Sequence, residues 1–124
     1  MKIAVCAKSL GMESIADDRF GRAEYYVIFD TNSLMDETVE NTAKNESAGA
    51  GGSAVRLLSK SNVEVVLVPE LGPKAVDAVN GFEMKAYRYA DRKTVRETIE
   101  AYQAGQLKQI ETSTTKSHSG LRRA

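Results

Sequence analysis

Two short apolar runs, KIAVCA at residues 2–7 and VEVVLV at residues 63–68, constrain the fold of this chain more than any other feature. The first run is continuous, as expected of a central strand that is covered on both faces of a sheet. The second is apolar almost throughout and predicts another buried strand. A sheet with both faces covered needs helices on both sides, so these two runs point to an α/β protein.

The segments between and after these runs complete the predicted order of elements. YYVIFD at residues 25–30 is aromatic and β-branched, and LMDETVEN forms the outer, acidic arm of a hairpin. Beyond residue 49 the spacing of apolar residues changes from every second residue to the 3.6-residue period of a helix. This change predicts a helix that ends at Asn62. The remaining predicted elements are a helix at 74–80 between Pro73 and Gly81, a strand at 82–87, and a helix at 95–104 capped by Thr94 and Glu97.

This order, β-β-β-α-β-α-β-α, predicts a five-stranded mixed sheet with helices on both faces. Right-handed crossovers give the strand order 3-2-1-4-5, in which strand 2 is antiparallel. The arrangement resembles the ribonuclease H-like architecture. We expect residues 1–110 to form the domain and residues 111–124, which have few apolar side chains to bury, to form a flexible tail.

Charge and cysteine content exclude several classes of protein. Lysine and arginine balance aspartate and glutamate at 17 each, so no bulk charge attracts nucleic acid or an anionic membrane. The apolar run at the start is shorter than the core of a signal peptide, and no run has the length of a bilayer-spanning helix. The single cysteine, Cys6, cannot form a disulfide within one chain. We therefore expect a cytoplasmic protein.

The strand directions bring five polar segments to one edge of the predicted sheet. Strands 1, 3, 4 and 5 run parallel, so the loops that follow them open at the same edge, and antiparallel strand 2 begins there. The segments are 8–20, 20–23, 44–53, 69–73 and 88–93. Ligands of open α/β sheets bind outside the carboxyl ends of the strands. A binding site is expected at this edge.

Three motifs at this edge have both a binding and a structural interpretation. Gly49, Gly51 and Gly52 precede a helix, whose first N–H groups favour an anion, but they also suit a flexible connector. Arg19 and Arg22 can hold oxyanions with forked donors, or pair with the neighbouring Asp17 and Asp18. Gly72-Pro73 can simply begin a helix, or offer the N–H groups of residues 74–76 to the same edge.

Cys6 has the most sharply opposed interpretations. A cysteine inside an apolar run is typical of a small core side chain. Its place near the carboxyl end of the first strand also makes it the one thiolate candidate for a soft metal or cluster iron. No nucleophile, base and orienting acid occur at a recognisable spacing, and the first strand carries no acid for magnesium. A non-enzymatic protein is expected.

Residues 1–110 resemble, in order, the dinitrogenase iron-molybdenum cofactor biosynthesis family. The matching pieces are MKIAV, DDRFGRAEYYVIFD, SAGAGGSAVRLL, NVEVVLVPELGPKAVDAV and TVRETIEAYQAGQLKQI. The resemblance implies a ribonuclease H-like fold without ribonuclease activity. Residues Phe20-Gly21-Arg22 correspond to the FGR segment of the family, Gly49 to Gly52 to its glycine-rich turn, and Gly72-Pro73 to its GP segment.

This chain departs from the family pattern at three places. Arg19 stands where some members have a histidine before FGR, and VPEL precedes Gly72 where a small or polar residue and a further glycine are common. YRYADRK at 87–93 replaces a glycine-bearing turn.

The resemblance implies a carrier that binds an iron-molybdenum cofactor, an iron-sulfur precursor or a similar anionic group. Its partners would be that ligand and cofactor-assembly proteins, without nucleic acid or membrane. The alternative is a regulatory or protein-interaction module that keeps the fold without a cluster. The residues expected to bind the cofactor are Arg19, Phe20, Gly21, Arg22, Gly49, Gly51, Gly52, Gly72 and Pro73, with Cys6 as the metal candidate.

Overall fold

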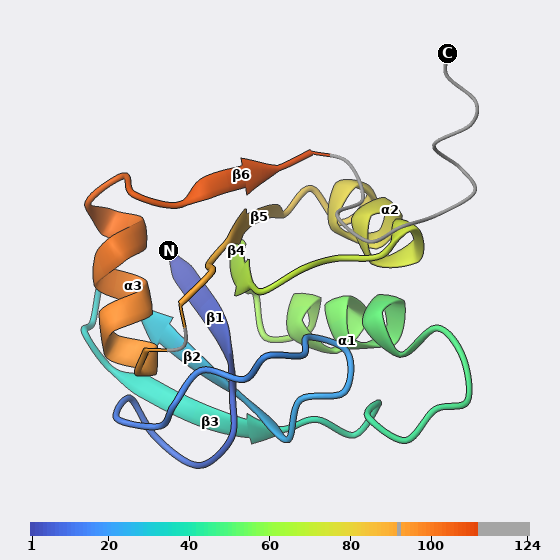
Figure 1. The fold of residues 1–124 in the computed structure, drawn as a ribbon, viewed down its shortest axis with the longest axis horizontal. Helices are drawn as coiled ribbons and strands as arrows, with labels where there is room; N and C mark the ends of the chain where they lie inside the picture. Colours follow the sequence, from blue (N-terminus) through green and yellow to red (C-terminus); the bar gives the residue numbers. More distant parts are fainter. Residues whose placement is uncertain (92, 112–124) are drawn as a thin grey trace.

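The computed structural model describes residues 1–91 and 93–111, which form three helices and six strands (Figure 1). In chain order the elements are β1 (Lys2–Ala7), β2 (Tyr25–Asp30), β3 (Asp36–Glu40), α1 (Ala50–Ser59), β4 (Val65–Val68), α2 (Pro73–Gly81), β5 (Lys85–Arg88), α3 (Val95–Gln103) and β6 (Lys108–Ile110). The expected tail, apart from residue 111, lies outside the described residues. The division into a domain and a tail stays a prediction.

The sheet has the order β3-β2-β1-β4-β5-β6. β1 pairs with β4, and β4 with β5, in parallel, whereas β2 is antiparallel to both β1 and β3. The predicted order 3-2-1-4-5 with antiparallel strand 2 is therefore confirmed. The ribonuclease H-like assignment stays a prediction, because a mixed sheet with helices does not by itself test it.

The predicted number of strands is wrong, because β6 adds a sixth that is antiparallel to β5. β6 has three residues, of which Ile110 alone is buried, so it is too short to produce an alternating pattern in the sequence. The strand expected at 82–87 begins later, at Lys85, because Glu83 has a left-handed φ of 59° in the turn that ends α2.

The continuous apolar run of β1 is explained by two cores, one on each face of the sheet. Ala4 and Cys6 face the core under α1 and α2, whereas Ile3, Val5 and Ala7 face the core under α3. Figure 1 shows α1 and α2 on one side of the sheet and α3 on the other. Helices on both faces were expected and are confirmed.

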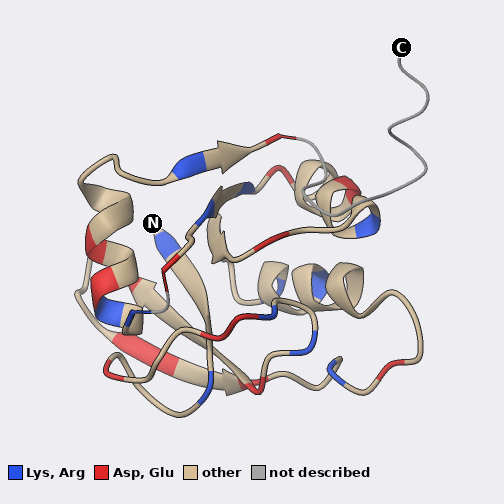
Figure 2. Cartoon of the chain, in the orientation of Figure 1, with Lys and Arg blue, Asp and Glu red and all other residues tan. Residues whose placement is uncertain are grey.

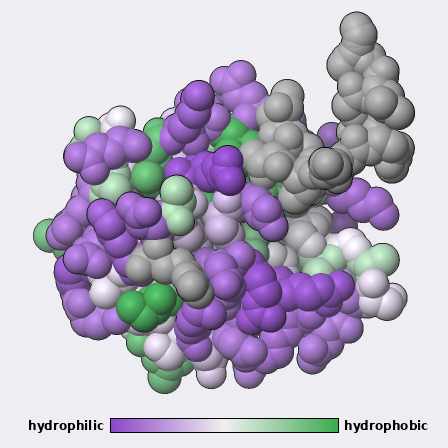
Figure 3. Space-filling model, in the orientation of Figure 1, coloured by the Kyte–Doolittle hydropathy of each residue, from purple (hydrophilic) through white to green (hydrophobic). Residues whose placement is uncertain are grey.

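Charges of both signs are interspersed over the molecule (Figure 2), and the face drawn in Figure 3 is mainly hydrophilic with separated hydrophobic patches. Within the described part of the chain, none of the helices has the length and apolar character needed to span a bilayer. Any recognition by charge must therefore depend on a local group of residues.

The start of α3 carries the predicted capping box. The Thr94 hydroxyl accepts from the backbone N–H of Glu97 at 3.1 Å, and the Glu97 carboxylate accepts from the backbone N–H of Thr94 at 3.1 Å. We expect Thr94→Ala to lower the free energy of unfolding by about 1 kcal/mol, because it leaves a helix N–H without its acceptor. Urea unfolding measures this, and Thr94→Ser, which keeps the hydroxyl, should stay close to wild type. Equal loss in both variants would contradict the capping explanation.

Candidate functional site

A cavity of about 600 Å³ opens at the edge of the sheet where β1 and β4 end. It is lined by residues 19–22 before β2, residues 49–52 at the start of α1, and residues 70–75 between β4 and the first turn of α2. We call this cavity the rim pocket. All nine residues that the sequence analysis named for cofactor binding line it: Arg19, Phe20, Gly21, Arg22, Gly49, Gly51, Gly52, Gly72 and Pro73.

Fewer segments meet in the rim pocket than the sequence analysis expected. Of the segment 8–20, only Arg19 and Phe20 line it, and none of its described lining residues comes from 88–93. Described residues of 88–93 line a separate cavity of about 450 Å³ with α3 and the start of β6. Described residues of 88–93 reach the same edge of the sheet, where the Tyr89 hydroxyl donates to the Asp17 carbonyl oxygen, but they do not line the rim pocket.

Both helices that begin at the rim pocket lack a side-chain cap. α1 follows Gly49, whose φ of 74° is left-handed and favours glycine, and α2 follows Gly72 with Pro73 as its first residue. Neither N-cap residue accepts a hydrogen bond through a side chain. The positive ends of two helix dipoles therefore meet at one cavity, which favours a negatively charged occupant.

Two glycines set the width of the rim pocket. A Cβ added to Gly21 would lie 2.7 Å from the backbone nitrogen of Gly51 and 2.9 Å from its Cα, so only glycine lets the turn at 20–22 approach α1 this closely. A Cβ on Gly51 would lie 3.1 Å from Cβ of Ala75 on α2. These two glycines therefore let the turn at 20–22, α1 and α2 pack closely around the pocket.

Three cations and one acid line the rim pocket, namely Arg19, Arg22, Lys74 and Glu70. The arginines are also held by the protein. Arg19 Nε lies 3.4 Å from Asp17 Oδ1 and 3.9 Å from Asp18 Oδ1, so its predicted pairing with both acids is found. Arg22 instead donates from Nη1 to the carbonyl oxygen of Lys44 at 2.6 Å.

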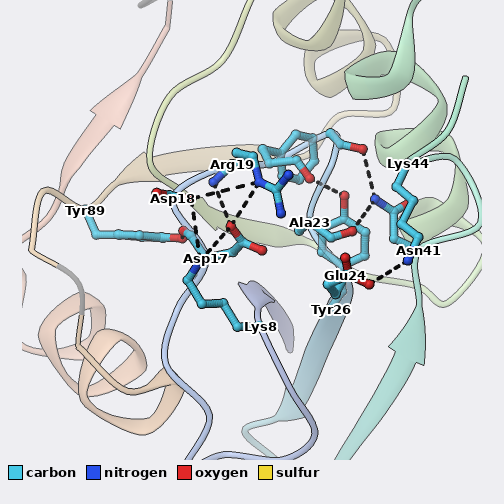
Figure 4. Close-up of polar contacts among 12 residues, drawn as sticks. Lys8, Asp17, Asp18, Arg19, Ala23, Glu24, Tyr26, Asn41, Lys44 and Tyr89 are labelled. Carbon is cyan, nitrogen blue, oxygen red and sulfur yellow. Dashed lines mark hydrogen bonds and ion pairs between the residues drawn. The ribbon is translucent and has the colours of Figure 1, made fainter. Parts of the chain in front are cut away.

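The carboxylate of Asp17 is buried beneath Arg19 and is fully shielded from solvent. Figure 4 shows it between Arg19 and Lys8, whose Nζ lies 3.7 Å from Asp17 Oδ1. The Tyr89 hydroxyl donates to the backbone carbonyl oxygen of Asp17. Asp17 Oδ2 has no hydrogen-bond partner among the described residues. Asp17 therefore holds Arg19 at the pocket in two ways: its carboxylate forms an ion pair with the guanidinium of Arg19 and accepts a hydrogen bond from the backbone N–H of Arg19.

Asn41 is a residue of the site that the sequence analysis missed. Its Nδ2 donates to the carbonyl oxygens of Gly21 and Ala23, each at 2.9 Å, and its Oδ1 accepts from the Ala43 N–H at 3.0 Å (Figure 4). The side chain is 1% exposed. The Asn41 amide thus joins the turn at residues 20–22, which we call the FGR turn, to the chain that follows β3. A single Asn in a polar stretch has no periodic pattern, so the sequence does not reveal this role.

The loop before α1 is tied to the FGR turn by further contacts. Besides accepting a hydrogen bond from Arg22 through its carbonyl oxygen, Lys44 forms an ion pair with Glu24, the residue before β2. The hydrogen bond with Lys44 lowers the pKa of Glu24 and raises that of Lys44. Arg22 therefore has a structural partner in addition to its place at the pocket.

Cys6 does not reach the rim pocket. Its side chain is 1% exposed, lies in the core under α1 and α2, and donates to the carbonyl oxygen of Leu67 at 3.6 Å. Burial raises the pKa of the Cys6 thiol to about 12. Within residues 1–91 and 93–111, no three His, Cys, Asp or Glu side chains cluster to hold a metal ion. This geometry favours the interpretation of Cys6 as a core side chain over that of a metal ligand.

We expect the Cys6 thiol of the folded protein to resist alkylation. At about pH 8, iodoacetamide should react at least about 100-fold more slowly with the native protein than with protein in concentrated urea, because the buried thiol forms little thiolate. Mass spectrometry of timed samples measures both rates. Equal rates would contradict the buried position of Cys6.

Comparison with protein families and with known proteins finds matches over most of the chain. The family model described as "Dinitrogenase iron-molybdenum cofactor" matches residues 1–105. An uncharacterised protein from Methanocaldococcus jannaschii is 28% identical over 95 residues, which cover 74% of this chain and 80% of that protein.

Two solved structures have the same fold over almost their whole length. The apo form of the orange protein from Desulfovibrio gigas superposes with a TM-score of 0.88 and 32% identity, covering 92% of this chain and 96% of its own. A NifB-like protein from Thermotoga superposes with a TM-score of 0.81 and 33% identity, covering 94% of this chain and 98% of its own.

Proposed function

This chain belongs to the dinitrogenase iron-molybdenum cofactor family, and from that premise we propose that it is a small, non-enzymatic carrier whose rim pocket binds an anionic metallocluster. The observation that carries the proposal is the meeting of three cations and two uncapped helix starts in one cavity. Charge and oriented N–H groups together favour a compact anion.

The rim pocket fits such a ligand in size and in the shape of its walls. A volume of about 600 Å³ lies within the usual range of small-molecule sites. Gly49 also lines the pocket, and an added Cβ there would meet no atom within 4 Å, so a bulky group can approach its backbone. No described lining residue is a cysteine or histidine, so charge and backbone N–H groups, rather than a sulfur or imidazole ligand, would supply most of the binding.

The proposal keeps several features that the family resemblance implies. These are an iron-molybdenum cofactor or iron-sulfur precursor as the ligand, cofactor-assembly proteins as partners, a cytoplasmic location and a ribonuclease H-like fold. The structural relative from Desulfovibrio gigas is an apo form, which means that this relative also has a state with a bound group. That relation supports a binding role for the shared fold.

The proposal is tested by mixing the protein with isolated iron-molybdenum cofactor under anaerobic conditions. Molybdenum and iron should co-elute with the protein in gel filtration, as measured by metal analysis. Lys74→Gln should reduce the retained metal about tenfold, because Lys74 lines the pocket, is exposed, and has a side chain that makes no hydrogen bond or ion pair with the described residues.

The matched control is Lys85→Gln at the start of β5, because parallel strands place that residue at the opposite edge of the sheet from the rim pocket. It removes the same charge and should retain the cofactor as wild type does. Absence of co-elution with wild-type protein would refute the carrier proposal. Equal loss in both lysine variants would show attraction by overall charge rather than a site.

The second candidate is a regulatory or interaction module that keeps the fold without a cluster. The contact of Arg22 with the Lys44 carbonyl favours it, because this arginine is already used within the protein. Recovery of a specific partner by protein that retains no metal after exposure to the cofactor would support this function.

A further inference from the structure

Glu70 differs from every other described residue that lines the rim pocket. The fourteen lining residues are glycine, alanine, proline, leucine, phenylalanine, arginine and lysine, apart from this one glutamate. Among them, Glu70 has the one side chain with an oxygen that can coordinate a metal ion. It is also the one side chain that opposes the positive charge of the cavity.

The position of Glu70 makes its carboxylate available to a ligand. It lies on the short connection between β4 and α2, two residues before the N-cap residue Gly72, and it is exposed. No hydrogen bond or ion pair is found for its side chain within residues 1–91 and 93–111, although Arg19, Arg22 and Lys74 line the same cavity. Its charge is therefore not used to hold the fold.

A carboxylate in this place has opposite effects on two classes of anion. A simple oxyanion carries negative charge on all its outer atoms, so Glu70 repels it while the three cations attract it. An anionic cluster with an exposed metal ion accepts a lone pair from the carboxylate oxygen, with an exchangeable solvent ligand leaving the metal. Repulsion of one class combined with attraction of the other is how sites achieve selectivity.

We propose that Glu70 is the selectivity residue of the rim pocket: it disfavours simple oxyanions and supplies the one side-chain oxygen that binds an exposed metal of the cluster. This inference rests on the proposed function and specifies the class of ligand that the rim pocket binds. The ligand is an anionic complex with a metal ion at its surface, held by the cations and helix starts that line the pocket and by Glu70, which lies just before the start of α2.

The test compares two probes on Glu70→Gln, which keeps the side-chain shape and removes the charge. Titration calorimetry with molybdate at fixed salt measures oxyanion affinity, which should rise about three- to tenfold in the variant. Anaerobic gel filtration with isolated iron-molybdenum cofactor measures cluster retention, which should fall about tenfold. Glu64→Gln is the matched control, because Glu64 is exposed just before β4 at the other edge of the sheet.

A damaged fold cannot produce opposite changes with the two probes, and Glu70→Asp adds a second check. This variant keeps the charge on a shorter side chain, so it should bind molybdate as wild type does but retain less cofactor. Tighter binding of both probes by Glu70→Gln would reduce Glu70 to a repulsive group and overturn the proposal. An unchanged affinity for molybdate would overturn it as well.

The outcomes also separate this inference from the proposed function. Wild-type protein that retains no cofactor refutes the carrier function, and the role of Glu70 with it. Wild-type protein that retains the cofactor no better than Glu70→Gln refutes the role of Glu70 alone.

Discussion

Gly21→Ala is expected to lower the free energy of unfolding by about 3 kcal/mol and to abolish binding in the rim pocket. The added methyl would lie 2.7 Å from the backbone nitrogen of Gly51 and 3.0 Å from the carbonyl carbon of Ala50. Both are backbone atoms of the first turn of α1, so no flexible side chain can move aside. Either the FGR turn or the start of α1 must shift, and both are walls of the pocket.

Gly52→Ala, at the third residue of α1, is the matched control. Its added Cβ would lie at an ordinary contact distance of 3.8 Å from the Lys74 carbonyl oxygen. Alanine in a helix loses less backbone entropy on folding than glycine, so this variant should be more stable by about 0.5–1 kcal/mol. Urea unfolding of the two variants should therefore give changes of opposite sign. Similar values for both would show that the close approach of residues 21 and 51 does not constrain the fold.

The position of the rim pocket could be predicted from the sequence because it follows from strand direction. KIAVCA and the run at 63–68 identify two strands. The hairpin and the helix between them return the chain to the direction of the first strand, so the two strands pair in parallel and residues 49–52 and 70–75 reach one edge. Arg19 to Arg22 reach the same edge because β2 runs antiparallel and begins there. None of these steps requires the packing of individual side chains.

The contacts that shape the pocket could not be predicted in the same way. The approach of Gly21 to Gly51 joins residues thirty positions apart and depends on how far α1 lies above the sheet. The sequence around Cys6 fits both a core residue and a ligand. The register of the sheet decides between them, because it determines which face of β1 carries the Cys6 side chain. β6 has too few residues for a periodic pattern.

Among the substitutions of polar residues, Asn41→Asp is expected to cause the largest loss of stability. It replaces the side-chain amide by a carboxylate and leaves the side-chain volume almost unchanged. The buried Asn41 amide donates two hydrogen bonds to the FGR turn and the residue after it, to Gly21 O and Ala23 O. A carboxylate has no donor at this position, so two carbonyl oxygens lose their partners and face a negative charge. We expect the free energy of unfolding at neutral pH to fall by about 3–4 kcal/mol, as for buried groups left without partners.

Asn45→Asp provides the control for Asn41→Asp, because it adds the same charge four residues later in the same loop, at an exposed position. It should change the free energy of unfolding by less than about 0.5 kcal/mol. Urea unfolding measures both variants, and cofactor retention by the folded fraction shows whether the FGR turn keeps its place. A variant of Asn41 that unfolds like the Asn45 control would mean that the turn is held by Tyr26 and Arg22 instead, since the Tyr26 hydroxyl donates to the Phe20 carbonyl and Arg22 to that of Lys44. The two variants are expected to differ because only the buried amide of Asn41 donates to main-chain oxygens in place of water, and one of these oxygens belongs to Gly21 at the pocket wall.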